Sequence, residues 1–236
     1  MMLPNTTNQQ MVYQDNQLIE ACYHLTLNEK RLVLLAITKI DRSQKPRADL
    51  PNRFVITASE WAEAYPQKNP YMELKRAVAE LYERSIQLRA GNGIKRGRMR
   101  WITSELEYED SSVSLTFTHE VSLYLQGMVD SFTKFDLVNI KALTSTYSIR
   151  LYELLKQWSS TGMRLETIDN LRFSLNAVDA YPRWADFNRY VIKKAVIEVS
   201  EKTNLKVKYE TIKKGREVTA IKFYFVEEKQ VDMFKT

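Results

Sequence analysis

The chain has 236 residues, enough for one large domain or two of ordinary size, and 44% of them are hydrophobic. Its formal net charge of +6 favours a polyanionic partner such as nucleic acid or an anionic membrane. One cysteine, Cys22, excludes an internal disulfide, and two histidines, His24 and His119, are too few for an ordinary Cys/His zinc site. No apolar run reaches membrane-spanning length and the first ten residues carry no apolar signal core, so a cytoplasmic protein without a membrane partner is expected.

The first half of the chain predicts a helix, a short strand and two further helices. Residues 1–16 are expected to form a flexible tail. Thr26 and Glu29 have the spacing of a capping box and start the first helix. After a polar loop and a strand over 54–56, Thr57 and Glu60 repeat that spacing and start a short helix. A long helix follows from Pro70 to about residue 84.

Several strands follow that long helix. Residues 86–89 alternate like a strand, and the glycines at 91 and 93 permit a turn. The next segment is basic, and strands are predicted over 101–108 and 113–118, with a short helix over 119–125 and a strand over 132–137. A basic hairpin is therefore expected directly after the long helix.

The second half repeats this plan. Residues 75–85 and 193–203 share a pattern of two bases, Ala-Val, and later Glu, at an offset of 118. Ala-Tyr-Pro occurs at 64–66 and again at 180–182, and Leu-Thr precedes a helix at both 25–26 and 143–144. A helix to about 158, a long helix over 184–202 and a hairpin of strands 205–212 and 218–226 complete the second copy. Matches at nearly one offset indicate two versions of one domain.

A helix, short strand, short helix, long helix and β-hairpin in that order make a winged helix. The predicted fold is therefore α+β, with two tandem, pseudo-symmetric winged-helix domains. The N-terminal domain is expected over 17–137, the C-terminal domain over 138–228, and a tail over 229–236.

The long helices carry the candidate chemistry. On a helical wheel, one face of the second is apolar (Phe187, Val191, Ile192, Ala195, Val196 and Val199), and Leu74, Ala77, Val78 and Leu81 form that face of the first. Arginine can read guanine in the major groove, and lysine contacts phosphates. The outward residues and the basic hairpins are therefore the candidate DNA contacts: Arg183, Arg189, Tyr190, Lys193, Lys194, Lys213, Lys214, Arg216, Tyr71, Lys75, Arg76, Lys95, Arg96, Arg98 and Arg100.

No catalytic pattern is present in the sequence. It has no phosphate-binding Gly-x-x-x-x-Gly-Lys loop and no His-x-His pair, so no cofactor, metal or catalytic residue is predicted. Three functions stay open as alternatives: a winged-helix transcriptional repressor, a DNA-nicking enzyme that uses a tyrosine, and a module whose wings bind protein.

The chain resembles the iteron-binding plasmid replication initiator (Rep) proteins over roughly residues 17–226. The resemblance is carried by Phe132-Thr133-Lys134-Phe135-Asp136-Leu137, by residues 147–155, and by the second half from Asp186-Phe187 through Lys213-Lys214-Gly215-Arg216 to Phe225, with residues 25–35 matching the first helix. It implies binding to directly repeated origin sequences, origin opening, recruitment of a host initiator and helicase, and autorepression as a homodimer with initiation as a monomer. It also implies that the C-terminal long helix reads most of the bases, through Arg183, Arg189 and Lys193; Tyr190 stands where relatives can have a basic residue.

Overall fold

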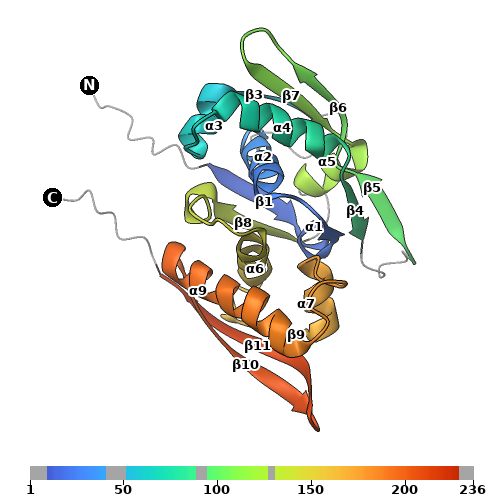
Figure 1. The fold of residues 1–236 in the computed structure, drawn as a ribbon, viewed down its shortest axis with the longest axis vertical. Coiled ribbons are helices and arrows are strands. Elements are labelled where there is room, and N and C mark those ends of the chain that lie inside the picture. The colour runs from blue at the N-terminus through green and yellow to red at the C-terminus, as the bar shows by residue number, and fades with distance from the viewer. Residues whose placement is uncertain (1–9, 41–51, 89–94, 127–130, 229–236) are drawn as a thin grey trace, which may run out of the picture.

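A computed structural model of the chain describes residues 10–40, 52–88, 95–126 and 131–228. Two α+β units lie against each other, the N-terminal unit in the upper part of Figure 1 and the C-terminal unit in the lower part. In each unit a long helix crosses in front of a three-stranded antiparallel sheet (Figure 1). The arrangement confirms the prediction of two tandem winged-helix domains.

The N-terminal unit contains the predicted order of elements. Its helices are α2 (Leu27–Thr38), α3 (Ala58–Ala64) and α4 (Pro70–Tyr82), and its strands are β3 (Arg53–Thr57), β6 (Ile102–Glu107) and β7 (Ser112–Phe117). Both capping boxes are present, with Thr26 and Thr57 accepting from the amides of Glu29 and Glu60. The sheet has the order β3-β7-β6, so β7 is central.

The C-terminal unit repeats this topology. Its helices are α6 (Thr146–Lys156), α7 (Ile168–Ser174), α8 (Trp184–Phe187) and α9 (Lys193–Lys202), and its strands are β9 (Met163–Thr167), β10 (Leu205–Lys214) and β11 (Glu217–Glu227). A π-helical segment, Asn188–Ile192, joins α8 to α9, so the predicted helix over 184–202 is continuous but widened in the middle. The sheet order β9-β11-β10 matches β3-β7-β6 strand for strand.

The apolar faces of the long helices form the cores of the two units. Leu74, Ala77, Val78 and Leu81 are buried on α4. On the second long helix the buried residues are Phe187, Val191, Ile192, Ala195, Val196 and Val199. Both predicted faces are confirmed, because each helix packs its apolar side on its own sheet and first helix.

The expected N-terminal tail is wrong for residues 11–16. Asn16 begins α1, and the residues before it form β1 (Met11–Asp15), which pairs antiparallel with β8 (Phe132–Asp136). Val12 is completely buried, and Tyr13 contacts Phe132 at a ring-centroid distance of 5.8 Å. Residues 11–15, Met-Val-Tyr-Gln-Asp, show no clear alternation of polar and apolar residues. The partner strand lies some 120 positions away in the sequence, so only the fold reveals the pairing. Residues 1–9 of the expected tail and residues 229–236 fall outside the described residues.

The sequence predicted that the basic hairpin after α4 is the counterpart of the C-terminal wing. The structure shows that this prediction is wrong. β4 (Ser85–Leu88) lies between β5 (Gly97–Arg100) and β2 (Cys22–Tyr23) and pairs with both in a separate sheet. The strands that occupy the positions of β10 and β11 are β6 and β7, and their turn carries Glu109 and Asp110. The pseudo-symmetric wing of the N-terminal unit is therefore acidic at its turn, and the β4–β5 hairpin is an insertion.

The remaining helices connect the two units. α1 (Asn16–Glu20) contacts α6 and α7, while α5 (His119–Gln126) lies against β1. A short 3-10 helix, Leu137–Asn139, follows β8 near the predicted domain boundary. The exact position of that boundary stays a prediction.

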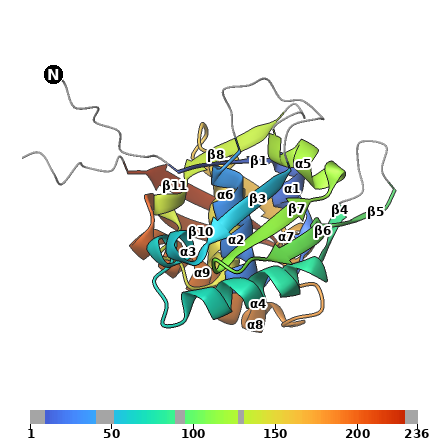
Figure 2. The same cartoon turned by 90° about the horizontal axis from the view of Figure 1, so that it is seen from above.

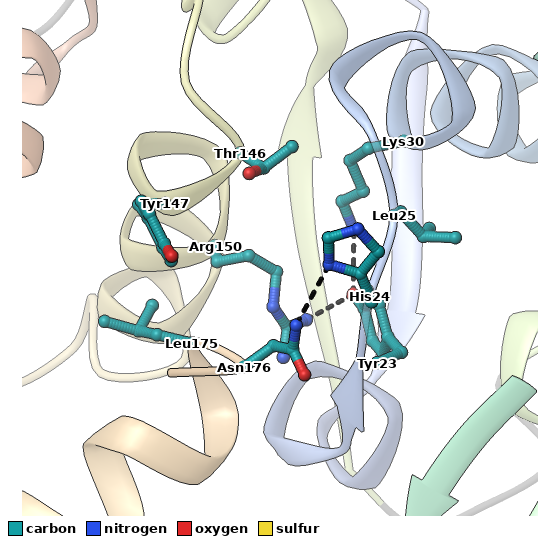
Figure 3. Close-up of a pocket in the computed structure, with 9 residues that line it drawn as sticks. All are labelled: Tyr23, His24, Leu25, Lys30, Thr146, Tyr147, Arg150, Leu175 and Asn176. Atoms are coloured by element: carbon teal, nitrogen blue, oxygen red, sulfur yellow. Dashed lines mark hydrogen bonds between the residues drawn. The ribbon is translucent and has the colours of Figure 1, made fainter. Parts of the chain in front are cut away.

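A buried polar cluster joins the units. Lys30 on α2 contacts Glu153 on α6 at 2.7 Å, and both side chains are almost fully buried. The Arg150 guanidinium donates to Tyr23 Oη and to the carbonyls of Ala21 and Ser174. Beside this cluster lies a cavity of about 100 Å³, lined by residues of both units, among them His24, Tyr147 and Asn176 (Figure 3). The cavity belongs to the junction because both units line it. The Arg150 guanidinium beside it already donates to acceptors of the protein itself.

Candidate nucleic-acid interface

The two long helices lie on the same side of the molecule. In Figure 1 both α4 and α9 cross in front of their sheets, and in Figure 2 α4 and α8 run along the same lower side. The outward residues predicted from the helical wheels therefore lie on one face of the protein. Such a face can meet one DNA duplex with both helices.

The exposed side of the C-terminal long helix is strongly basic. Arg189, Lys193 and Lys194 are exposed, and no described carboxylate forms an ion pair with any of them. The Arg189 guanidinium and the Lys194 ammonium lie 5.3 and 5.6 Å from the centroid of the Tyr190 ring. The Tyr190 ring therefore keeps both cations close to it by cation–π contacts without neutralising their charge.

Tyr190 is itself held by Tyr181 from the loop before α8. The two rings stack with centroids 5.6 Å apart and an interplanar angle of 27°. Tyr181 has φ +53°, which is uncommon for a residue with a side chain. Its counterpart in the sequence repeat, Tyr65, is buried at the end of α3 against Trp61. The two Ala-Tyr-Pro segments thus occupy the same connection but have different roles.

Arg183 precedes α8 and is mostly exposed. Its Nε lies 2.8 Å from the Asp186 carboxylate in the first turn, and 83% of the Arg183 side chain is accessible. The pair leaves the outer edge of the guanidinium open to solvent. Arg183 is thus placed next to the basic helix face.

The C-terminal wing extends beyond its sheet. β9 pairs with Ala220–Tyr224 of β11, and no other described strand pairs with the end of the β10–β11 hairpin. Gly215 at the turn has φ +64°, a conformation that favours glycine. Lys213, Lys214 and Arg216 surround it and are all exposed. The hairpin therefore presents three cations at its end.

The N-terminal long helix differs because its outward residues are paired with carboxylates. Tyr71 Oη donates to Glu107 on β6, and Lys75 Nζ lies 2.8 Å from the same carboxylate. The contact with Lys75, and then that with Tyr71, lowers the pKa of Glu107, and the hydrogen bonds with Glu107 raise the pKa values of Lys75 and Tyr71. Arg76 contacts Glu80 one helical turn away at 3.1 Å.

The β4–β5 hairpin carries the other predicted N-terminal contacts. Lys95 and Arg96 are exposed before β5, and Arg98 donates to Ser85 Oγ at 3.1 Å. Arg100 contacts Glu83 at 3.3 Å and the carbonyl of Tyr82 at 3.1 Å. The predicted turn at 91–93 falls outside the described residues. These four cations lie on an insertion beside α5 and β2, apart from the outward residues of α4.

Arg172 and Asn188 organise the C-terminal face, and the sequence patterns did not single them out. The Arg172 guanidinium lies 4.3 Å from the centroid of the Phe187 ring and donates to four carbonyls of the loop before α8, those of Ala177, Ala180, Tyr181 and Pro182. Asn188 Oδ1 accepts from Tyr209 Oη at 2.8 Å, which ties the π-helical segment to β10. An arginine in the last turn of a short helix gives no pattern from which such contacts could be predicted.

Within the described ranges, no group of three or more His, Cys, Asp and Glu side chains could hold a metal ion. None of the helices that the structure describes is both long and apolar enough to cross a membrane.

Comparisons with known proteins agree with this geometry. Residues 11–156 match the family model "Initiator Replication protein, WH1" and residues 167–225 match "Initiator Rep protein, WH2". A "Replication initiation protein" of Escherichia coli is 26% identical over 94% of this chain and 72% of its own length, and the "PI protein" of Escherichia coli is 26% identical over 89% and 81%. The crystal structure of Pi initiator protein in complex with iteron DNA superposes with a TM-score of 0.78 at 24% identity, covering 95% of this chain and all of the other. The two family matches cover most of the chain, and it therefore belongs to the Rep family of plasmid replication initiator proteins, with WH1 and WH2 winged-helix domains.

Proposed function

We propose that this chain binds directly repeated DNA sequences in a replication origin and opens the duplex beside them. One observation carries the proposal: both long helices lie on one side of the molecule, and the C-terminal one exposes a basic face without a described carboxylate partner. The Pi initiator, which shares the fold, was crystallised in complex with iteron DNA.

The two long helices would enter successive major grooves on one face of the duplex. Because equivalent grooves recur about every 10 bp, one protomer would cover roughly 20 bp. Arg183, Arg189 and Lys193 would supply most of the base readout, with Tyr190 and Lys194 beside them. The C-terminal wing would add phosphate contacts through Lys213, Lys214 and Arg216, which carry no sequence information by themselves.

The N-terminal contacts would be weaker. Tyr71, Lys75 and Arg76 hold carboxylates of their own domain, and each must exchange that contact for DNA. Lys95, Arg96, Arg98 and Arg100 would contact the backbone beside the main face. This difference supports a C-terminal domain that dominates affinity.

Origin opening would follow from DNA deformation by several bound protomers. A tandem array in helical phase strains the duplex, and A·T-rich DNA nearby opens at the lowest free-energy cost. The chain carries no phosphate-binding loop for ATP, so unwinding would require a host initiator and a helicase. We further propose that the chain acts without catalysis in the cytoplasm, initiates as a monomer and represses its own gene as a homodimer.

Footprinting on the DNA that flanks the gene tests the proposal. Protection of several direct repeats about two helical turns long is the expected result. Protection of a single inverted repeat would instead indicate a repressor without initiator activity. A covalent adduct between protein and supercoiled origin DNA in the presence of Mg²⁺ would indicate a nicking enzyme, and binding to duplex DNA that does not depend on salt would indicate a protein-interaction module.

A further inference from the structure

We propose that Glu107 is a specificity determinant that suppresses binding of the N-terminal long helix to DNA of arbitrary sequence. The inference rests on the proposed function and concerns the wing of the N-terminal domain. Glu107 lies at the end of β6, and its carboxylate holds both Tyr71 and Lys75 on the outward face of α4. These are the residues that would otherwise approach the phosphates.

The pseudo-symmetry of the two sheets shows what is unusual about this carboxylate. The central strands carry equivalent buried residues, Val113, Leu115 and Phe117 on β7 and Ile221, Phe223 and Phe225 on β11. Their cross-strand partners on the wings are therefore equivalent as well. Glu105 and Glu107 pair with Leu115 and Val113, whereas Tyr209 and Thr211 pair with Phe223 and Ile221.

The same positions thus hold carboxylates in one domain and neutral side chains in the other. In the C-terminal domain, Tyr209 contacts the long helix through a neutral hydrogen bond to Asn188. Lys193, which the sequence repeat aligns with Lys75, has no described carboxylate partner there. At these two positions the charge difference lies on the side of the wing that contacts the long helix.

This arrangement affects affinity more than stability. The side chains of Glu107 and Lys75 are both exposed, and an exposed ion pair contributes little to the stability of a fold. The lowered pKa of Glu107 keeps its carboxylate ionised at neutral pH. An ionised carboxylate beside Lys75 cancels the attraction of that lysine for a phosphate and repels the DNA backbone.

The consequence is discrimination between sites. On DNA of arbitrary sequence, the contacts that the N-terminal helix makes with DNA are too weak to displace the Glu107 carboxylate from Lys75 and Tyr71. At the cognate repeat, the C-terminal helix and correct base contacts hold the duplex close, and Lys75 and Tyr71 can exchange Glu107 for DNA. A penalty of this kind, applied to all sequences and overcome only at the right one, is a common route to specificity.

The test compares Glu107→Gln with the unmodified chain on two fluorescent duplexes of equal length, one carrying the footprinted repeat and one of random sequence. Removing the carboxylate is expected to raise affinity for the random duplex roughly fivefold to tenfold near 0.1 M salt and to steepen the salt dependence by about one phosphate contact. Affinity for the repeat rises less, so the ratio of the affinity for the repeat to the affinity for the random duplex falls. Glu228→Gln makes the same change in net charge and also breaks an exposed ion pair, that with Lys206, at the end of the β10–β11 hairpin opposite its turn. It carries no predicted DNA contact and serves as the control.

A second variant separates the contact from the overall charge. If Glu107 acts through Lys75, the double variant Glu107→Gln/Lys75→Gln loses the gain on random DNA, and thermal melts of all variants coincide. A gain that persists in the double variant, or an affinity for random DNA unchanged by Glu107→Gln, would overturn the inference. Failure of the unmodified chain to protect any direct repeat would instead overturn the proposed function itself.

Discussion

Lys30 and Glu153 form an ion pair of 2.7 Å inside the junction between the two winged-helix units, and 1% and 0% of their side chains are accessible. One residue comes from the first helix of each unit, α2 and α6. Lys30 also donates to Tyr23, and Arg150 approaches Glu153 at 3.5 Å. The two domains are therefore joined by charges that water does not reach.

Removing one member of this pair is expected to destabilise the chain. Lys30→Met leaves the Glu153 carboxylate buried with only the distant Arg150 contact, at a cost of about 3–5 kcal/mol in the free energy of unfolding. Urea denaturation followed by circular dichroism measures this loss. The double variant Lys30→Met/Glu153→Leu removes both charges and should recover most of the stability, and a double variant as unstable as the single one would contradict this account.

Arg189 should carry sequence readout. Arg189→Ala is expected to weaken binding to the cognate repeat by about 1–3 kcal/mol and to reduce the difference between that repeat and base-substituted duplexes. Competition binding with a panel of single-base substitutions measures both effects. Lys134→Ala is the control, because Lys134 is an exposed cation on β8, which lies on the side of the molecule opposite α4 in Figure 2. Equal weakening on every duplex would assign Arg189 to the phosphates.

The wing should contribute charge without sequence preference. Lys213→Ala is expected to weaken binding to all duplexes by a similar factor and to lower the slope of log K against log salt by about one. Titrations at four salt concentrations with cognate and random duplexes give the slope. A loss restricted to the cognate duplex would place Lys213 on a base edge.

Arg172 should act as a positioning residue for the loop before α8. Arg172→Lys keeps the charge but loses the planar fork that reaches four carbonyls, so stability should fall by about 1–3 kcal/mol. Cognate affinity should fall as well, because Tyr181 and Arg183 lose their fixed positions. Arg216→Lys at the exposed wing turn is the matched control and should melt like the unmodified chain. Unchanged melting and binding in Arg172→Lys would show that the loop before α8 keeps its conformation without the hydrogen bonds of Arg172.

Asp15 should make stability depend on pH. Burial raises its pKa from 3.8 to about 6, and Oδ2 has no hydrogen-bond partner among the described residues. Because the folded state favours the protonated form, the stability that Asp15 contributes is greatest below pH 4 and is lost as the pH rises through about 6. Asp15→Asn can still accept from the amide of Gln17, so it should stabilise the chain at pH 7 by at most about 3 kcal/mol.

Thermal melts between pH 4 and 8 check this prediction. The difference in melting temperature between Asp15→Asn and the unmodified chain should grow with pH across that range. Asp136→Asn, on the strand paired with β1, is a suitable comparison because Asp136 also accepts an amide hydrogen bond but is partly exposed. A constant difference across the range would exclude Asp15 as the titrating group.

Local sequence patterns predicted most of the elements because they depend on near neighbours. Thr26 with Glu29 and Thr57 with Glu60 form capping boxes within one helical turn, and the apolar positions of α4 and α9 recur at helical spacing. The same patterns placed Arg189, Lys193 and Lys194 on the exposed side of their helix. These spacings are set by the geometry of the helix itself and do not depend on how the rest of the chain folds.

Contacts between distant segments were not predictable in this way. The strand at residues 11–15 exists because β8 lies beside it, and the β4–β5 hairpin resembles a wing in sequence although β6 and β7 occupy the wing positions. Both errors come from strand pairing, which depends on partners far away in the chain.

By itself, the sequence determined that the chain has two copies of one domain and that each copy has a long helix with an apolar and an outward face, because both follow from repeats and periodicity along the chain. Only the tertiary structure decided which charges remain available. It brought Glu107 onto Lys75 in one domain and left Lys193 without a described carboxylate in the other. The physical reason is that the charge of a side chain belongs to the sequence, whereas its neutralisation depends on which strand the fold places opposite it.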